Sequence, residues 1–125
     1  ASYKTIFATD GAFAAMKTDG SISCWGSNSW GGAGGPTDAG YVMVYSTSYA
    51  FAALTPGGSI TAWGSSNSGG GGAPTTDGFT SVFSTPKAFA ALRPDGSLAA
   101  WGSIGQGAVA PTDAGYTRFA LSMSD

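Results

Sequence analysis

The stretch that decides the fold is AFAALRPDGSLAAWG, residues 88–102. Two apolar runs flank Pro94-Asp95-Gly96, where proline presets φ for the first turn position and glycine accepts the left-handed conformation that closes a short hairpin loop. If Arg93 faces Ser97 across this turn, the register running outward places Phe89 opposite Trp101. The stretch therefore predicts a β-hairpin with two largely apolar faces, and we expect both faces to be covered.

The same hairpin pattern occurs three times at a fixed period. The AFAA runs begin at residues 12, 50 and 88 and the Trp-Gly pairs at residues 25, 63 and 101, so both intervals are 38 residues. Such a period marks a repeat architecture in which each unit buries its apolar face against its neighbours. Each large ring buries about 150–250 Å², so rings should anchor the layers. The candidate core anchors are the facing pairs Phe13 and Trp25, Phe51 and Trp63, and Phe89 and Trp101.

A third strand is expected before each hairpin. Residues 3–9, 41–47 and 79–85 alternate aromatic and branched aliphatic side chains, which is typical of strands. Glycine-rich loops at 26–35, 64–73 and 102–110 fill the remainder, and no helix is expected. We therefore predict one all-β repeat domain over residues 1–125, a blade-like or solenoid array of three tandem 38-residue units. The units have about three strands each and run over about 3–40, 41–78 and 79–115, followed by a terminal strand at 116–122.

Charge and hydropathy disfavour two classes of partner. Five Lys or Arg stand against seven Asp, with no Glu and no His, so no basic stripe is available for a phosphate backbone and nucleic-acid binding is not expected. No apolar run reaches the roughly 18 residues needed to cross a bilayer, so we do not expect the chain to be embedded in a membrane. Because it begins at Ala1 and not at methionine, we expect a processed or excised piece.

No residue set identifies a reaction. General acid–base catalysis usually needs His, Glu or a carboxylate pair, whereas every acid here is an Asp in or near a turn, and Asp19 and Asp95 share their turn position with Gly57. No Asp-x-Asp-x-Asp run offers a calcium loop, and a single Cys without His does not make a zinc site. Cys24 stands where the other units have Ala62 and Ala100, which favours a small buried thiol over an intermolecular bridge. We therefore expect no enzyme, no cofactor and no metal site.

The hairpin motif also resembles a known family. Residues 91–102, Ala-Leu-x-x-Asp-Gly-Ser-x-x-x-Trp-Gly, followed by Gly105-Gln106-Gly107, resemble the regulator-of-chromosome-condensation type of β-propeller repeat, and still more its shortened variant in long bacterial and microalgal arrays. The likeness covers essentially the whole chain and implies blade-like units. The family's blade is longer and carries a histidine that this chain lacks, so exchange-factor or ubiquitin-ligase roles do not carry over. Three units are also fewer than the family's usual ring of about seven blades. A threefold β-trefoil is the alternative fold.

The two ends of the chain suggest how copies meet. Residues 116–122 repeat the first strand, and Phe119, Leu121 and Met123 share one face. An open sheet end is a template for another strand, so we expect this end to contact the first strand of a neighbour head to tail. Such a contact joins two different patches, so it closes into a ring or propagates as a filament. The expected function is a structural module of an extracellular or cell-surface filament or ring, with copies of itself as partners. The candidate self-association residues are Tyr3, Ile6, Phe7, Phe119, Leu121 and Met123.

Carbohydrate binding is the alternative function. Trp30 is the candidate glycan contact, because it lies in a loop where the second unit has Ser68 and the repeat does not require it; packing within the loop is the competing interpretation. Pro-Thr recurs in the loops near Ser and Gly, so O-linked sugars are an option for an extracellular protein, with a turn role as the other option. The candidate O-glycosylation sites are Thr37, Thr75 and Thr112.

Overall fold

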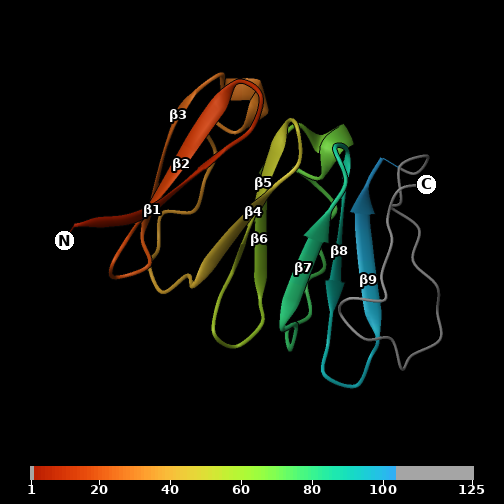
Figure 1. Ribbon diagram of the computed structural model, residues 1–125. Helices are drawn as coiled ribbons and strands as arrows, with labels where there is room; N and C mark the ends of the chain where they lie inside the picture. The colour runs from red at the N-terminus through yellow and green to blue at the C-terminus, as the bar shows by residue number, and fades with distance from the viewer. Residues whose placement is uncertain (1, 104–125) are drawn as a thin grey trace.

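The computed structural model describes residues 2–103, which form three antiparallel sheets of three strands each (Figure 1). Strand order within each sheet follows the chain. The all-β class and the three repeated three-stranded sheets are confirmed, and the expected terminal strand at 116–122 lies outside the described residues. The strands are β1 (Tyr3–Ala8), β2 (Ala12–Lys17) and β3 (Ile22–Gly26) in the first sheet, β4 (Met43–Ser46), β5 (Ala50–Leu54) and β6 (Ile60–Gly64) in the second, and β7 (Ser81–Ser84), β8 (Ala88–Leu92) and β9 (Leu98–Gly102) in the third.

The hairpin register is the one that the turn sequence predicts. Phe89 pairs with Trp101, and the first and second sheets repeat this pairing of Phe with Trp. In the third turn the backbone N–H of Gly96 donates to the carbonyl oxygen of Arg93 at 2.9 Å. Gly96 has a φ of 86°, a conformation that side-chain-bearing residues rarely adopt, which explains why glycine ends this turn.

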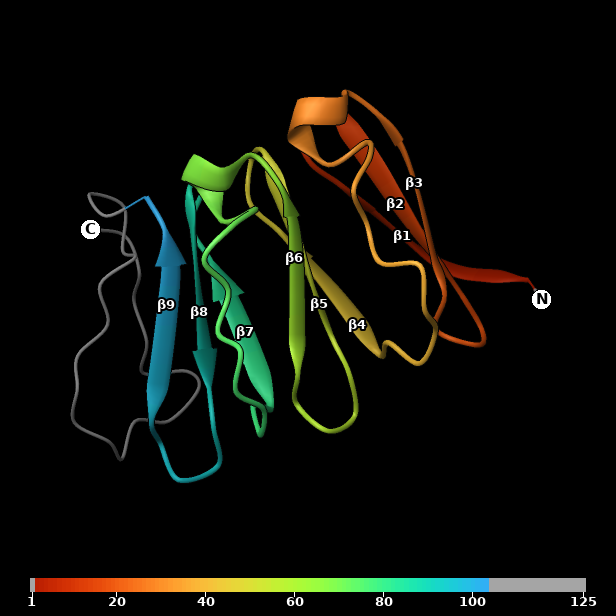
Figure 2. The same ribbon diagram turned by 180° about the vertical axis from the view of Figure 1, so that it is seen from behind.

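The three sheets stack face to face, as the two opposite views in Figures 1 and 2 show. Because side chains alternate along a strand, β2 turns Ala12, Ala14 and Met16 toward the second sheet and its other residues away from it. Alanines at these positions allow a close approach of the facing rings. The first core cluster includes Ala12, Ala14, Met16, Val44, Phe51, Ala53 and Trp63, and the second includes Ala50, Ala52, Leu54, Val82, Phe89, Ala91 and Trp101.

Backbone hydrogen bonds join successive sheets at both ends of the hairpins. At one end the N–H of Asp10 donates to Ser48 O at 2.8 Å, and the N–H of Ser48 donates to Pro86 O at 2.9 Å. At the other end, the N–H of Tyr41 donates to Gly20 O at 3.2 Å. The same contacts therefore recur once per repeat, and they fix the register of one sheet on the next.

The glycine-rich loops contain short helices, although the sequence predicts none. One turn of 3₁₀ helix follows β3 (η1, Asn28–Trp30) and another follows β6 (η2, Ser66–Ser68). Gly31 and Gly69 come directly after these turns, with φ of 106° and 105°. A left-handed residue ends a helical turn most easily when it is glycine, so the glycine-rich composition that suggested loops is also compatible with these turns.

Candidate functional site: the open face of the first sheet

One face of the first sheet has no other sheet against it within residues 2–103. On this face Ile6 is 59% exposed, Phe13 46% and Trp25 45%. The corresponding residues of the second sheet, Phe51 and Trp63, are 0% and 3% exposed, and those of the third are equally buried. We call the surface formed by Tyr3, Ile6, Phe13, Ala15 and Trp25 the open face.

Two of the six expected core anchors lie on this open face and not in the core. Phe51, Trp63, Phe89 and Trp101 are buried between sheets, whereas Phe13 and Trp25 are not, because no sheet precedes theirs in the described residues. The two rings are still stacked, with centroids 5.5 Å apart and planes at 27°; the buried pairs have centroids 5.4 and 5.3 Å apart. The strand register therefore determines the stacking geometry of the two rings even where no sheet covers them.

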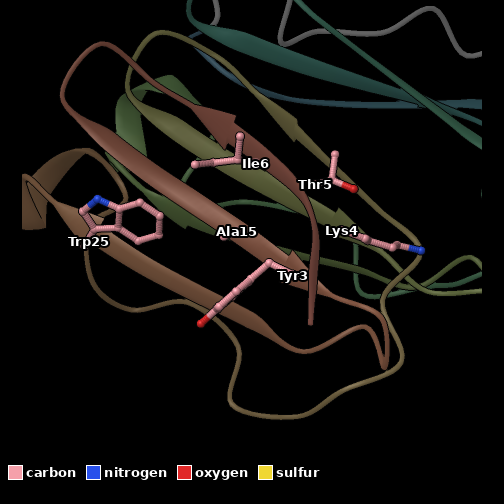
Figure 3. A pocket seen from close by; sticks show the side chains of 6 residues that line it. All are labelled: Tyr3, Lys4, Thr5, Ile6, Ala15 and Trp25. Atoms are coloured by element: carbon pink, nitrogen blue, oxygen red, sulfur yellow. The ribbon is translucent and has the colours of Figure 1, made fainter. Parts of the chain in front are cut away.

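A depression of about 530 Å³ lies on the open face beside Trp25 (Figure 3). Ala15 is buried at its base, and Tyr3, Ile6 and Trp25 surround it. The lining also includes Lys4 and Thr5. The Oη of Tyr3 lies 3.1 Å from the Oγ of Ser23, so the Tyr3 hydroxyl already has a hydrogen-bond partner. This site is suited to binding an apolar surface by contact.

The equivalent rings of the other sheets show what such a face contacts when it is covered. The indole N–H of Trp63 donates to Gly31 O at 3.2 Å, and that of Trp101 donates to Gly69 O at 3.1 Å. A Cβ on Gly31 would lie 2.5 Å from Cδ2 of Phe51, and a Cβ on Gly69 would meet Phe89 in the same way. Glycine is therefore required where the loop crosses the ring pair.

Sequence reasoning missed this role of Gly31 and Gly69. A signal was present, because each glycine stands six residues after the Trp of a Trp-Gly pair, at positions 25 and 63. The loops have similar glycine-rich compositions. Only the constant spacing from the preceding Trp distinguishes Gly31 and Gly69 from the glycines beside them.

The candidate self-association residues do not all share one surface. Tyr3 and Ile6 lie on the open face, whereas Phe7 points to the other side of the first sheet and packs against the core cluster shared with the second sheet, because successive residues of a strand alternate in direction. Phe119, Leu121 and Met123 lie outside the described residues. The exposed apolar surface is thus a face of the first sheet, whereas the expected contact is an open sheet end.

The candidate glycan contact Trp30 packs within the protein. Its ring centroid lies 4.6 Å from that of Tyr49 in the second unit, and its ring covers Gly11, where a Cβ would lie 2.5 Å from Cε3 of Trp30. The indole is still 38% exposed. Among the candidate O-glycosylation sites, Thr37 and Thr75 are exposed, and Thr112 lies outside the described residues.

The pKa values of several titratable groups are shifted by their immediate surroundings. Cys24 is half-buried, and burial raises the pKa of its thiol. The hydroxyl and backbone N–H of Ser97 both donate to Asp95 Oδ1, and these bonds lower the pKa of Asp95; Ser21 does the same for Asp19. Within residues 2–103, no three His, Cys, Asp or Glu side chains gather in a way that could hold a metal ion.

No protein-family model fits the chain, and no curated protein is significantly similar to it. In the part of the chain that the structure describes, no helix has both the length and the apolar character needed to cross a membrane.

Proposed function

We propose that this protein is a structural repeat module that associates head to tail, with the open face of one copy covered by the C-terminal end of a second copy. Because the two contacting patches differ, copies add in one direction and produce a filament or a ring outside the cell. The observation that carries the proposal is that the open face has the same residue types as two faces of this chain that are buried by a neighbouring repeat.

The amount of apolar surface available fits a reversible contact. Half of a buried ring corresponds to about 100 Å², and at about 25 cal/mol per Å² covering it contributes about 2–3 kcal/mol. Tyr3, Phe13 and Trp25 are each about half exposed, and Ile6 more so. Their summed contribution lies within the range of about 4–15 kcal/mol that association costs in lost motion, so we expect assembly to depend on concentration.

Within residues 2–103, strands pair only inside their own sheet. This supports an open, blade-like array over a β-trefoil, whose strands pair between units around a barrel. Within residues 2–103 the open face of the first sheet has no covering repeat, and head-to-tail association supplies one.

Sedimentation velocity over a concentration series tests the proposal. The full chain is expected to pass from monomer to larger species, and Trp25→Lys is expected to stay monomeric because a buried, unpaired charge would lie in the contact. Asn67→Lys, which adds the same charge at an exposed position of η2, is the matched control and should assemble like the original chain.

A chain that stays monomeric at every accessible concentration would contradict the proposal, as would a Trp25→Lys variant that assembles normally. Electron microscopy of the assembled sample then separates filaments from closed rings.

Carbohydrate binding is a second candidate, favoured by a different observation. The stacked, half-exposed rings of Phe13 and Trp25 form an apolar platform of the kind that suits the flat face of a sugar, whereas Trp30 is engaged with Tyr49. A glycan array probed with the monomeric chain tests it: signal lost in Trp25→Ala but kept in Trp30→Ala would place a sugar on the open face. Absence of any signal would remove this candidate.

A further inference from the structure

We propose that the open face receives a specific element of the second copy, the glycine loop after its third Trp-Gly pair, whose backbone carbonyl accepts a hydrogen bond from Nε1 of Trp25. This inference rests on the proposed head-to-tail association and specifies its contact. It assigns Phe13 and Trp25 as a receptor for a glycine loop.

The two internal junctions supply the geometry of this contact. In each one a Phe–Trp pair lies under a loop that follows a 3₁₀ turn, the glycine contacts the Phe ring, and its carbonyl oxygen accepts from the indole N–H at 3.2 or 3.1 Å. Phe13 and Trp25 form the same ring pair. No interaction of the Trp25 indole N–H with another residue occurs in the part of the chain that the structure describes.

Of the three loops that follow a Trp-Gly pair, only the third is left to cover the open face of another copy. The loops containing Gly31 and Gly69 already contact Phe51 and Phe89 of their own chain. The third loop begins at the Trp101-Gly102 pair, and Gly107 stands six residues after Trp101, the interval that separates Gly31 from Trp25 and Gly69 from Trp63. Gly107 lies outside the described residues and enters the argument through this spacing alone.

Hydrogen exchange of the indole N–H groups gives a direct readout on the receptor. In ¹⁵N-tryptophan-labelled monomer, the Nε1–H of Trp63 and Trp101 should exchange slowly because both donate to a glycine carbonyl in a buried site, whereas that of Trp25 should exchange fast. On assembly the Trp25 signal should become protected to a similar degree. Assembly, measured by sedimentation, with a Trp25 Nε1–H that still exchanges fast would overturn the inference and leave head-to-tail association standing.

Substitutions on both partners test the same contact. Trp25→Phe keeps an aromatic ring but removes the N–H and part of the apolar ring surface, so the dissociation constant is expected to rise at least about 2- to 10-fold, the effect of one neutral hydrogen bond. Gly107→Val places a side chain where the loop must cross the rings and should abolish assembly; Gln106→Ala, at the neighbouring position, is the control and should leave it intact. Normal assembly of Gly107→Val would overturn the inference.

A mixing experiment shows that such variants are folded. Trp25→Lys has a damaged receptor and an intact loop, whereas Gly107→Val has the reverse. Each alone should be monomeric, and an equimolar mixture should form a heterodimer that grows no further. A mixture that stays monomeric, although the original chain assembles, would contradict the assignment of the loop; if the original chain does not assemble either, the proposed function itself fails.

Discussion

The first and second sheets carry the same ring pair in two different environments. Phe51 and Trp63 are buried against the loop of the preceding unit, whereas Phe13 and Trp25 have the same register and a similar separation but remain about half exposed. Strand pairing therefore sets the position of the rings, and the neighbouring repeat supplies their burial. The same residue pattern therefore contributes to the core between sheets and to an exposed apolar face on the first sheet.

The largest expected difference between the two environments is the cost of removing a ring. Phe51→Ala should lower the free energy of unfolding by about 3–5 kcal/mol, because it leaves a cavity between two sheets. Phe13→Ala should cost the monomer about 1 kcal/mol or less. Urea denaturation at a concentration below assembly measures both values. Equal losses would mean that the open face is covered in the monomer.

The second expected effect concerns the loop that covers the rings. Gly69→Ala should cost about 3 kcal/mol or more, because it combines the penalty of a positive φ with a collision against Phe89. Gly34→Ala is the control: it has a positive φ of 86° but no atom within 4 Å of the added Cβ, so it should cost only about 1–2 kcal/mol. Thermal unfolding of the two variants compares them. A similar loss of stability in both variants would show that the loop moves enough to avoid the contact with Phe89.

The third expected effect concerns the indole ring and its N–H. Trp63→Phe should destabilise the monomer by about 1–3 kcal/mol, because the carbonyl oxygen of Gly31 loses a buried donor and the smaller ring leaves a cavity. Trp25→Phe should change monomer stability less, by about 0.5 kcal/mol, since Trp25 is already about half exposed. Chemical denaturation of both variants provides the measurement. A large loss in Trp25→Phe would indicate that Trp25 supports the fold of the first sheet.

Local patterns predicted the hairpins well because their information lies within a few residues. The turn Pro94-Asp95-Gly96 fixes the register, and the register fixes which residues share a face, so the pairing of Phe89 with Trp101 followed directly from the sequence. The direction in which units stack is different. It depends on contacts between residues about 30 positions apart, such as Trp63 with Gly31, which local patterns do not encode.

The candidate site was predicted only in part for the same reason. Tyr3 and Ile6 were found because the first strand is apolar, but Phe7 was assigned to the same surface although it alternates to the other face. Phe13 and Trp25 were assigned to the core because a repeat pattern treats all units as internal. Whether a ring pair is covered depends on the neighbouring sheet, and the residues of the first sheet alone do not reveal it.

The smallest expected effect compares the third hairpin turn with the second. Asp95 accepts hydrogen bonds from Ser97, which lower the pKa of its carboxyl, whereas the second turn has Gly57 at the same position. A lowered pKa in the folded state stabilises the fold above the unfolded pKa of about 3.9, and this contribution is lost as the pH falls through the folded value. Asp95→Gly should therefore be less stable than the original chain at pH 7, with the difference narrowing below about pH 4. Because Asp95 is fully exposed, the difference should be small.

The variant Ser97→Ala removes the hydroxyl that donates to Asp95, so its stability should depend less on pH. A stability difference between Asp95→Gly and the original chain that does not change with pH would rule out the carboxylate as its cause. Denaturation midpoints measured across this pH range provide the comparison.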